Sequence, residues 1–173
     1  ETLRHTQAIA NLLFQFGGMP FVDLAHLEKS NLNQGLLKYN RMKTGTPMSV
    51  EIIDSAYELL SLLRNNHSSS CSDRPDYLFH ILSGEYKREE GAYREYQSAL
   101  RKFNNHLKSL SRKLRLHSSV TSYTLRHSWA TTAKYRGVPI EMISESLGHK
   151  SIKTTQIYLK GFELEERTKV NKQ

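Results

Sequence analysis

Apolar residues recur at helical spacing near the start of the chain. They occupy positions 9, 12, 13 and 16, which is the one-sided stripe of an amphipathic helix. The pair Gly17-Gly18 can end this helix, because glycine adopts the left-handed conformation of a helix C-cap. A second short helix is predicted from Pro20, with the apolar residues at 21, 24 and 27 facing inward.

The next part of the chain changes to a strand-like pattern. Residues 36–39 and 48–50 are predicted to form short strands, joined by turn-forming residues at 43–47. Another helical stripe runs from Ile52 to Leu63. The polar segment at 65–76 is interpreted as a solvated loop and not as a domain boundary, since neither side of it is a complete core.

The second half of the chain is predicted to be helical. Apolar residues from Tyr93 to Leu114 alternate steps of three and four, which indicates one long amphipathic helix whose other faces are basic. Shorter helices are expected from a cap at Thr121 or Ser122 to Gly137, from Pro139 to Gly148, from Ser151 to Tyr158, and over 163–170. The pattern predicts a mainly α fold with a small antiparallel β-sheet near residues 31–51, that is, an α+β fold.

Composition narrows the class of protein. The chain has 173 residues, a formal net charge of +8 and a pI near 9.6, which suits a polyanionic partner such as nucleic acid. A merely basic protein explains the charge equally well. The only cysteine, Cys71, excludes an internal disulfide and fits a reducing cytosol, and no apolar run is long enough to cross a membrane. The scattered histidines and the missing phosphate-binding loop predict no metal and no cofactor.

Three residues near the carboxyl end suggest chemistry on a phosphate. Arg126 and His149 lie 23 residues apart, and Tyr158 follows nine residues later, each in a separate short helical segment. Arginine binds two phosphate oxygens at once, and histidine can donate a hydrogen bond to a third. The tyrosine hydroxyl can attack phosphorus and hold a broken DNA strand covalently, and a dense positive site is expected to lower its pKa.

The segments around these residues resemble those of a known family, the tyrosine recombinases (phage-type integrases). Residues 123–131 resemble the second-arginine box, 147–151 the "LGH" box, and 154–158 the nucleophile segment. Upstream, 18–24 is similar to the first-arginine box and 41–45 to the hairpin-lysine box. Each motif alone is a weak signal, but five motifs in the family order are a strong signal. The resemblance implies Tyr158 as nucleophile, Arg126 and His149 as phosphate ligands, and Lys43 as the acid for the leaving oxygen.

Two positions depart from the family pattern. Tyr123 stands where most members have a histidine or lysine, and it can donate a hydrogen bond but cannot do histidine's proton work at neutral pH. Pro20 stands where the first arginine is expected. We expect Arg41 to substitute for it, from an exposed strand face shared with Lys43, with its guanidinium pointing into the pocket of Arg126, His149 and Tyr158. An inactive enzyme and an engineered substitution are the alternatives. Asp23 is expected to hold a helix or an arginine.

The resemblance implies a complete activity and its partners. Residues 1–173 are expected to be a catalytic domain that lacks the family's N-terminal core-binding domain, from a cytoplasmic, DNA-associated bacterial protein. The full-length enzyme is expected to cut and rejoin double-stranded DNA through a 3′-phosphotyrosine, as a homotetramer on paired sites, while this chain alone is monomeric. The rival interpretations are a type IB topoisomerase-like enzyme and an inactive DNA-binding relative of the same fold.

Overall fold

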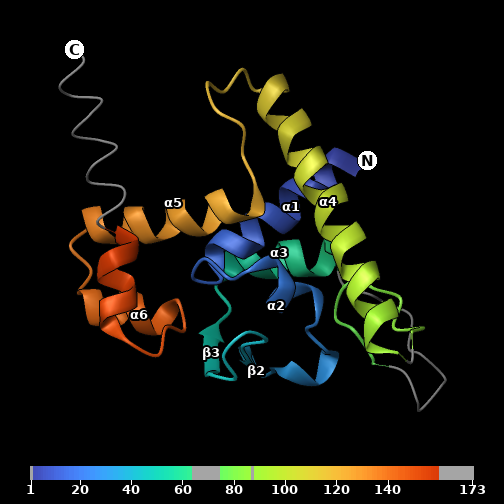
Figure 1. Ribbon diagram of the computed structural model, residues 1–173, viewed down its shortest axis with the longest axis horizontal. Coiled ribbons are helices and arrows are strands. Elements are labelled where there is room, and N and C mark those ends of the chain that lie inside the picture. Colours follow the sequence, from blue (N-terminus) through green and yellow to red (C-terminus); the bar gives the residue numbers. More distant parts are fainter. Residues whose placement is uncertain (1, 64–74, 87, 160–173) are drawn as a thin grey trace.

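The computed structural model describes residues 2–63, 75–86 and 88–159 of the chain. Figure 1 shows helices arranged around a small sheet. The elements are α1 (Thr2–Gln15), α2 (Phe21–Ala25), the 3-10 helix η1 (Lys29–Asn31), β1 (Leu32–Asn33), β2 (Leu36–Asn40), β3 (Pro47–Glu51), α3 (Asp54–Leu63), α4 (Glu89–Lys113), α5 (Ser122–Tyr135) and α6 (Ile140–Ser146). Residues 152–159 are also helical.

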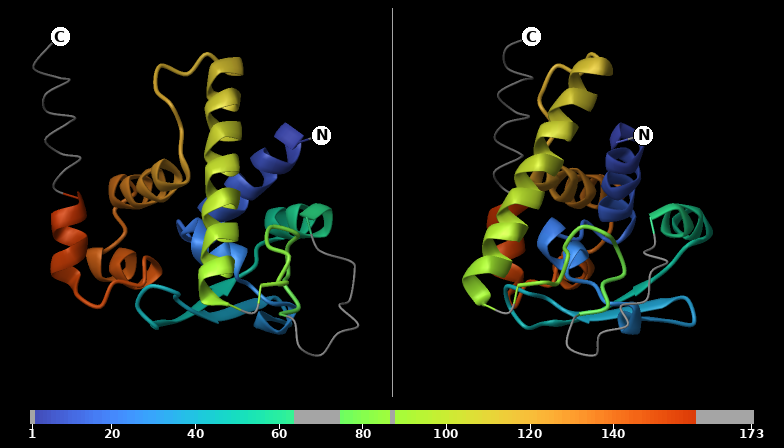
Figure 2. Two further views of the ribbon diagram at one scale, coloured as in Figure 1. Left: turned by 45° about the vertical axis from the view of Figure 1, so that its right-hand side comes forward. Right: turned by 90° about the vertical axis from the view of Figure 1, so that its right-hand side faces the viewer.

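The sheet is antiparallel, in the order β1-β2-β3. On β2, Leu37 pairs with Val50 and Tyr39 pairs with Met48. Both of these β2 side chains are buried, whereas Lys38 and Asn40 are exposed. This alternation turns one face of the sheet toward the helices, which lie above it in both views of Figure 2. The mainly α fold with a small antiparallel sheet is therefore confirmed.

Helix α1 is central to the core. Its stripe buries Leu12 and Leu13 completely, and the helix packs against α3, α4 and α5. A second, smaller apolar cluster joins α5, α6 and the segment 152–159 through Ala130, Ile143 and Leu159. The first cluster fixes α1, α2 and the sheet, and the second fixes the carboxyl-terminal helices, so most of the segments singled out in the sequence lie on or beside packed elements.

Local signals at the helix ends agree with the structure. Gly17 and Gly18 follow α1 with positive φ, and Pro20 is the N-cap of α2. Thr121 caps α5 by accepting a hydrogen bond from the Thr124 amide, and Pro139 precedes α6. The two-residue strand β1 was not predicted, because so short a strand has no periodicity of its own.

Some edges of the predicted helices differ from the structure. Ile53 is 54% exposed because α3 begins one residue later, and Leu114 is 67% exposed because it caps the end of α4 that extends beyond α1 and α5 (Figure 2). Most of the predicted loop at 65–76 and the helix predicted at 163–170 lie outside the described residues.

Candidate active site

Arg126 lies on α5 with its guanidinium buried between two other segments. Its side chain is 7% exposed. Nη1 donates to the Gly18 carbonyl at 2.8 Å, and Nη2 donates to the Leu147 carbonyl at 2.5 Å. Burial lowers the pKa of Arg126 to about 10, with a further lowering from Arg41. The guanidinium therefore stays charged at neutral pH and links the first-arginine box to the segment that contains His149.

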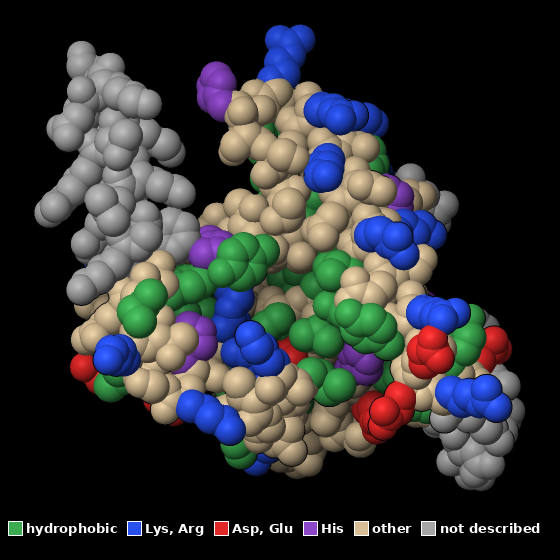
Figure 3. Space-filling view, viewed as in Figure 1, with side chains coloured by type: hydrophobic (Ala, Val, Ile, Leu, Met, Phe, Trp, Pro, Cys, Tyr) green, Lys and Arg blue, Asp and Glu red, His purple; other side chains and the backbone are tan. Residues whose placement is uncertain are grey.

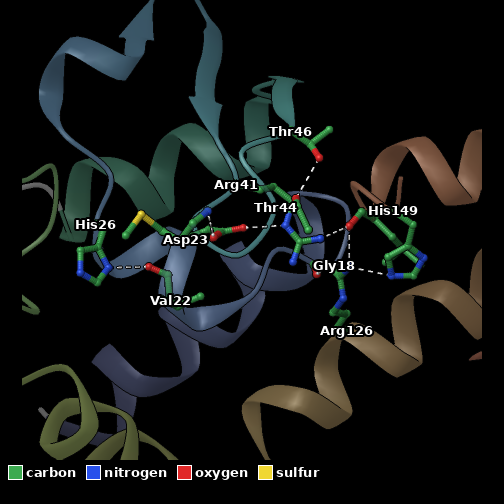
Figure 4. A network of polar contacts seen from close by, with 11 residues as sticks. Gly18, Val22, Asp23, His26, Arg41, Thr44, Thr46, Arg126 and His149 are labelled. Carbon is green, nitrogen blue, oxygen red and sulfur yellow. Dashed lines mark hydrogen bonds and ion pairs between the residues drawn. The ribbon is translucent and has the colours of Figure 1, made fainter. Parts of the chain in front are cut away.

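Arg41 points inward beside Arg126. Strand β2 ends at Asn40, and Arg41 is 7% exposed. Its Nε donates to Asp23 Oδ2 at 3.2 Å, and its Nη1 donates to the Leu147 carbonyl, the same oxygen that Arg126 contacts. Figure 4 shows the Arg41 guanidinium between Asp23 and the chain segment next to His149. Arg41 points toward Arg126, as predicted. The prediction that it is an exposed strand arginine is wrong, because a carboxylate and a carbonyl from distant parts of the chain bind its guanidinium.

Asp23, on α2, forms an ion pair with Arg41. Its side chain is completely buried, and Oδ1 accepts a hydrogen bond from the Met42 amide at 3.0 Å. Burial raises the pKa of Asp23, and the Met42 amide and Arg41 act in the opposite direction. The expectation that Asp23 holds an arginine is confirmed. Pro20 lies three residues earlier as the N-cap of α2.

Lys43 lies at the tip of the turn between β2 and β3. Its side chain is exposed, and the Gly45 amide closes the turn by donating to the Arg41 carbonyl at 2.8 Å. Residues 42–44 are in this turn and not in a strand, so the prediction that Arg41 and Lys43 share a strand face is wrong. Lys43 is nevertheless close enough to act electrostatically on His149.

His149 follows Gly148, which has a φ of +63°. A Cβ at Gly148 would collide with the Arg41 side chain, so both the conformation and the space require glycine there. Burial lowers the pKa of His149 to about 4, with further lowering from Arg126, Arg41 and Lys43. The ring is therefore neutral at pH 7. Its Nδ1 lies 2.8 Å from Thr155 Oγ1, and its Nε2 lies 3.4 Å from Arg126 Nη2.

Tyr158 is held in a group of rings. Its ring stacks on His127 with centroids 4.4 Å apart and an interplanar angle of 6°, and Tyr123 lies edge-on at 6.4 Å. The His149 ring is 5.9 Å away. Burial raises the pKa of Tyr158, Tyr123 raises it further, and Arg126 opposes them. The expected lowering of this pKa is wrong for the protein without DNA, because desolvation outweighs the nearby positive charge.

Tyr123 is the second residue of α5 and is 60% exposed, with the centroid of its ring 3.9 Å from that of His127. Figure 3 shows basic and histidine side chains around a hollow in this face of the molecule. The structure thus brings together Arg126, Arg41, His149 and Tyr158, with Tyr123 and Lys43 at the rim. Sequence reasoning missed Thr155, whose only signal was its place three residues before Tyr158.

Other features of the described residues do not mark a competing site. A cleft of about 800 Å³ beside β2 and β3 is lined by none of the six candidate residues. Within residues 2–63, 75–86 and 88–159, no group of three or more His, Cys, Asp or Glu side chains could hold a metal ion. None of the helices in these ranges is both long and apolar enough to cross a membrane.

Known proteins share both the sequence pattern and the fold. Residues 3–164 match the phage integrase family. The tyrosine recombinase XerA of Pyrococcus furiosus is 32% identical over 149 residues, which cover 85% of this chain and 47% of that protein. The chain thus spans about half the length of this curated relative.

Solved structures agree on the fold. A crystal structure of XerA recombinase superposes with a TM-score of 0.61 at 22% identity, covering 94% of this chain and 57% of that one. The Tn1549 transposon integrase has a TM-score of 0.59 at 14% identity, covering 87% and 52%. The match over residues 3–164, together with the relative at 32% identity, shows that this chain belongs to the phage integrase family.

Proposed function

We propose that the protein is a site-specific DNA recombinase that cuts and rejoins DNA strands through a 3′-phosphotyrosine at Tyr158. One observation carries the proposal: two buried guanidiniums, from Arg126 and Arg41, converge on a single carbonyl next to His149 and Tyr158. Each guanidinium has five N–H donors, so two guanidiniums that share one acceptor have further donors for a ligand. Their remaining N–H groups suit the oxygens of a phosphodiester, which arginine binds as a fork.

The chemistry assigned to these residues is a phosphoryl transfer without cofactor. The Tyr158 oxygen forms a bond to phosphorus, and the bond from phosphorus to the 5′ oxygen breaks. Lys43 gives a proton to the departing 5′ oxygen, and the phenolic proton leaves to water. Arg126 and Arg41 stabilise the five-coordinate transition state, where phosphorus carries more negative charge than in the ground state.

Arg41 takes the role of the arginine that Pro20 displaces. Its support is geometric: the guanidinium reaches the Leu147 carbonyl that Arg126 also reaches, and the buried Asp23 carboxylate fixes its other side. A guanidinium held in this way is preorganised, so little reorganisation is needed when charge develops on the phosphate. Tyr123, exposed above Tyr158, is assigned a hydrogen bond to the same phosphate.

The partner is double-stranded DNA. The net charge of +8 favours a polyanion, and the Tn1549 transposon integrase was solved in complex with a circular intermediate DNA. We assign the full-length protein a homotetramer on paired DNA sites, and this chain alone a monomer. The tetramer is assigned because strand exchange joins two DNA sites, and the pair of sites brings the protomers together on DNA.

Two substrates, a nicked duplex and a supercoiled DNA, together separate the proposal from its two rivals. In a duplex from the ends of the protein's own mobile element, nicked beside the cleavage position, attack releases the short fragment that carries the new 5′ hydroxyl. Loss of this fragment prevents rejoining and traps the covalent complex. We expect a denaturant-resistant protein–DNA band with wild type and none with Tyr158→Phe, although both bind the duplex. Binding without any covalent band indicates the inactive DNA-binding relative. Relaxation of supercoiled DNA without strand exchange between two sites indicates the topoisomerase-like enzyme.

A further inference from the structure

Thr155 is a buried polar residue whose hydroxyl has one side-chain hydrogen-bond partner in the described part of the chain. It lies in the helical segment 152–159, one turn before Tyr158, and has no exposed surface. Its hydroxyl is 2.8 Å from Nδ1 of His149. The neighbouring Thr154 is exposed and makes no side-chain contact of this kind within the described part of the chain. A buried hydroxyl aimed at a ring nitrogen suggests that it controls the ring.

The opposite side of the same ring fixes the direction of that hydrogen bond in the free protein. Nε2 of His149 faces Nη2 of Arg126 at 3.4 Å. A guanidinium has only donors, so Nε2 must present its lone pair. The charged and titratable groups around the ring are Arg126 from α5, Arg41 and Lys43 from the β2–β3 turn, and Tyr158 from 152–159. All three formal charges are positive, and they add to the effect of burial, which is the main reason that the ring stays neutral. The neutral ring then carries its proton on Nδ1, and the Thr155 hydroxyl accepts it.

Binding of a phosphate requires the reverse arrangement. A phosphate oxygen is an acceptor, so a histidine that contacts it through Nε2 must carry a proton there. With three positive groups still beside it, the ring gains that proton most easily if it gives up the one on Nδ1. Nδ1 then needs a donor. A hydroxyl can serve as acceptor in one state and as donor in the other, whereas no apolar side chain and no carboxylate can do both.

We propose that Thr155 is a positioning residue that lets His149 reverse its hydrogen bonds when phosphate binds. In the free protein Nδ1–H donates to Thr155 and Nε2 accepts from Arg126. In the bound state the Thr155 hydroxyl donates to Nδ1, and Nε2–H donates to a phosphate oxygen. The Nδ1 proton leaves to water and Nε2 takes a proton from water, so the ring is neutral before and after the change. This inference rests on the proposed function, since it concerns how the same site receives a phosphate.

The state of the ring can be read directly by nitrogen NMR of protein labelled with ¹⁵N-histidine, with His149→Asn to assign the signals. Sulfate is the probe, because it is a tetrahedral oxyanion that does not titrate near neutral pH. At pH 7 we expect the Nδ1–H form in the free protein and the neutral Nε2–H form at saturating sulfate. A doubly protonated ring in sulfate, an Nε2–H ring in the free protein, or signals that sulfate leaves unchanged would each overturn the proposal.

Variants of the two threonines supply a second, independent test. Thr155→Val keeps the shape but removes the hydroxyl, and Thr155→Ser keeps the hydroxyl. We expect Thr155→Val to slow covalent-complex formation about 10–100-fold at saturating DNA, as loss of a hydrogen bond to a critical group does. Thr155→Ser and the exposed-site control Thr154→Val should stay within about threefold of wild type.

These tests separate the failure of this inference from that of the proposed function. The NMR experiment needs no DNA cleavage, so it stands even if no covalent complex forms. If wild type forms the complex and Thr155→Val does so at the same rate while keeping its thermal stability, the positioning role of Thr155 is refuted and the recombinase assignment survives. Equal losses in Thr155→Val and Thr155→Ser would also refute it, because serine retains the hydroxyl.

Discussion

The buried pair of Asp23 and Arg41 makes a strong prediction about stability. Removing one member of a buried ion pair leaves the other charge uncompensated, which costs about 3–5 kcal/mol. Arg41→Ala removes the guanidinium from a carboxylate with no exposed surface. The Met42 amide still donates to that carboxylate, so we expect the lower end, a loss of about 3 kcal/mol in the free energy of unfolding.

The effect is large enough to measure in two ways. A loss of about 3 kcal/mol corresponds to a fall in Tm of about 6–12 °C for a protein of this size. Urea unfolding can be followed by the fluorescence of the only tryptophan, Trp129. Lys38→Ala, an exposed cation on β2, is the matched control and should change the free energy of unfolding by less than about 0.5 kcal/mol.

The pH dependence of this difference follows from the charge of Asp23. Burial already raises the pKa of Asp23, and loss of Arg41 raises it further. A carboxyl whose pKa is raised in the folded state lowers the free energy of unfolding as the pH rises, and this loss becomes smaller as the pH falls. The difference in the free energy of unfolding between wild type and Arg41→Ala should therefore become smaller at acid pH. If Arg41→Ala is as stable as Lys38→Ala at pH 7, the buried pair does not exist and the proposed anchoring of Arg41 is wrong.

Three further predictions concern catalysis and acid stability. Arg41→Ala, assayed well below its Tm, should slow formation of the covalent complex by about 10²–10³-fold, as loss of a transition-state clamp does, and Arg41→Lys should not restore it; an unchanged rate would mean that Arg126 suffices. Lys43→Ala should slow cleavage of ordinary DNA but not of DNA with a 5′-bridging sulfur, which leaves without a proton; equal defects on both would make Lys43 a binding residue only. The pKa of His149 is lowered to about 4, so its contribution to stability is present above pH 6.5 and lost as the pH falls toward 4; urea titrations of wild type and His149→Asn should show a steeper acid loss in wild type, and parallel curves would contradict this.

Much of the fold could be predicted because its signals are local. Helix α1 shows its stripe within one window of the sequence, and its end is marked by Gly17-Gly18. The cap of α5 is a single residue, Thr121, whose role depends only on the residues that follow it. The five family boxes preserved their order, so Arg126, His149 and Tyr158 could be selected before their positions in space were known.

The polar contacts of the site could not be predicted in this way, because they join distant segments. Arg41 is separated by 18 residues from Asp23 and by 106 from Leu147. Nothing near Arg41 in the sequence indicates that it is buried, and the strand pattern suggested the opposite. The raised pKa of Tyr158 has the same origin, since the desolvation that raises it comes from several packed elements and not from its own helix. Thr155 was missed because a threonine beside a second threonine carries no signal of its own.

The proposed function requires that Tyr158, and no other tyrosine, becomes joined to DNA. The chain has nine tyrosines, and Tyr123 lies in the same group of rings with its side chain exposed. The most direct measurement is peptide mapping by mass spectrometry of the covalent complex trapped on the nicked duplex. We expect a nucleotide adduct on Tyr158, unchanged in position in Tyr123→Phe and absent in Tyr158→Phe. An adduct on Tyr123 or on any other residue, or an adduct that persists in Tyr158→Phe, would contradict it.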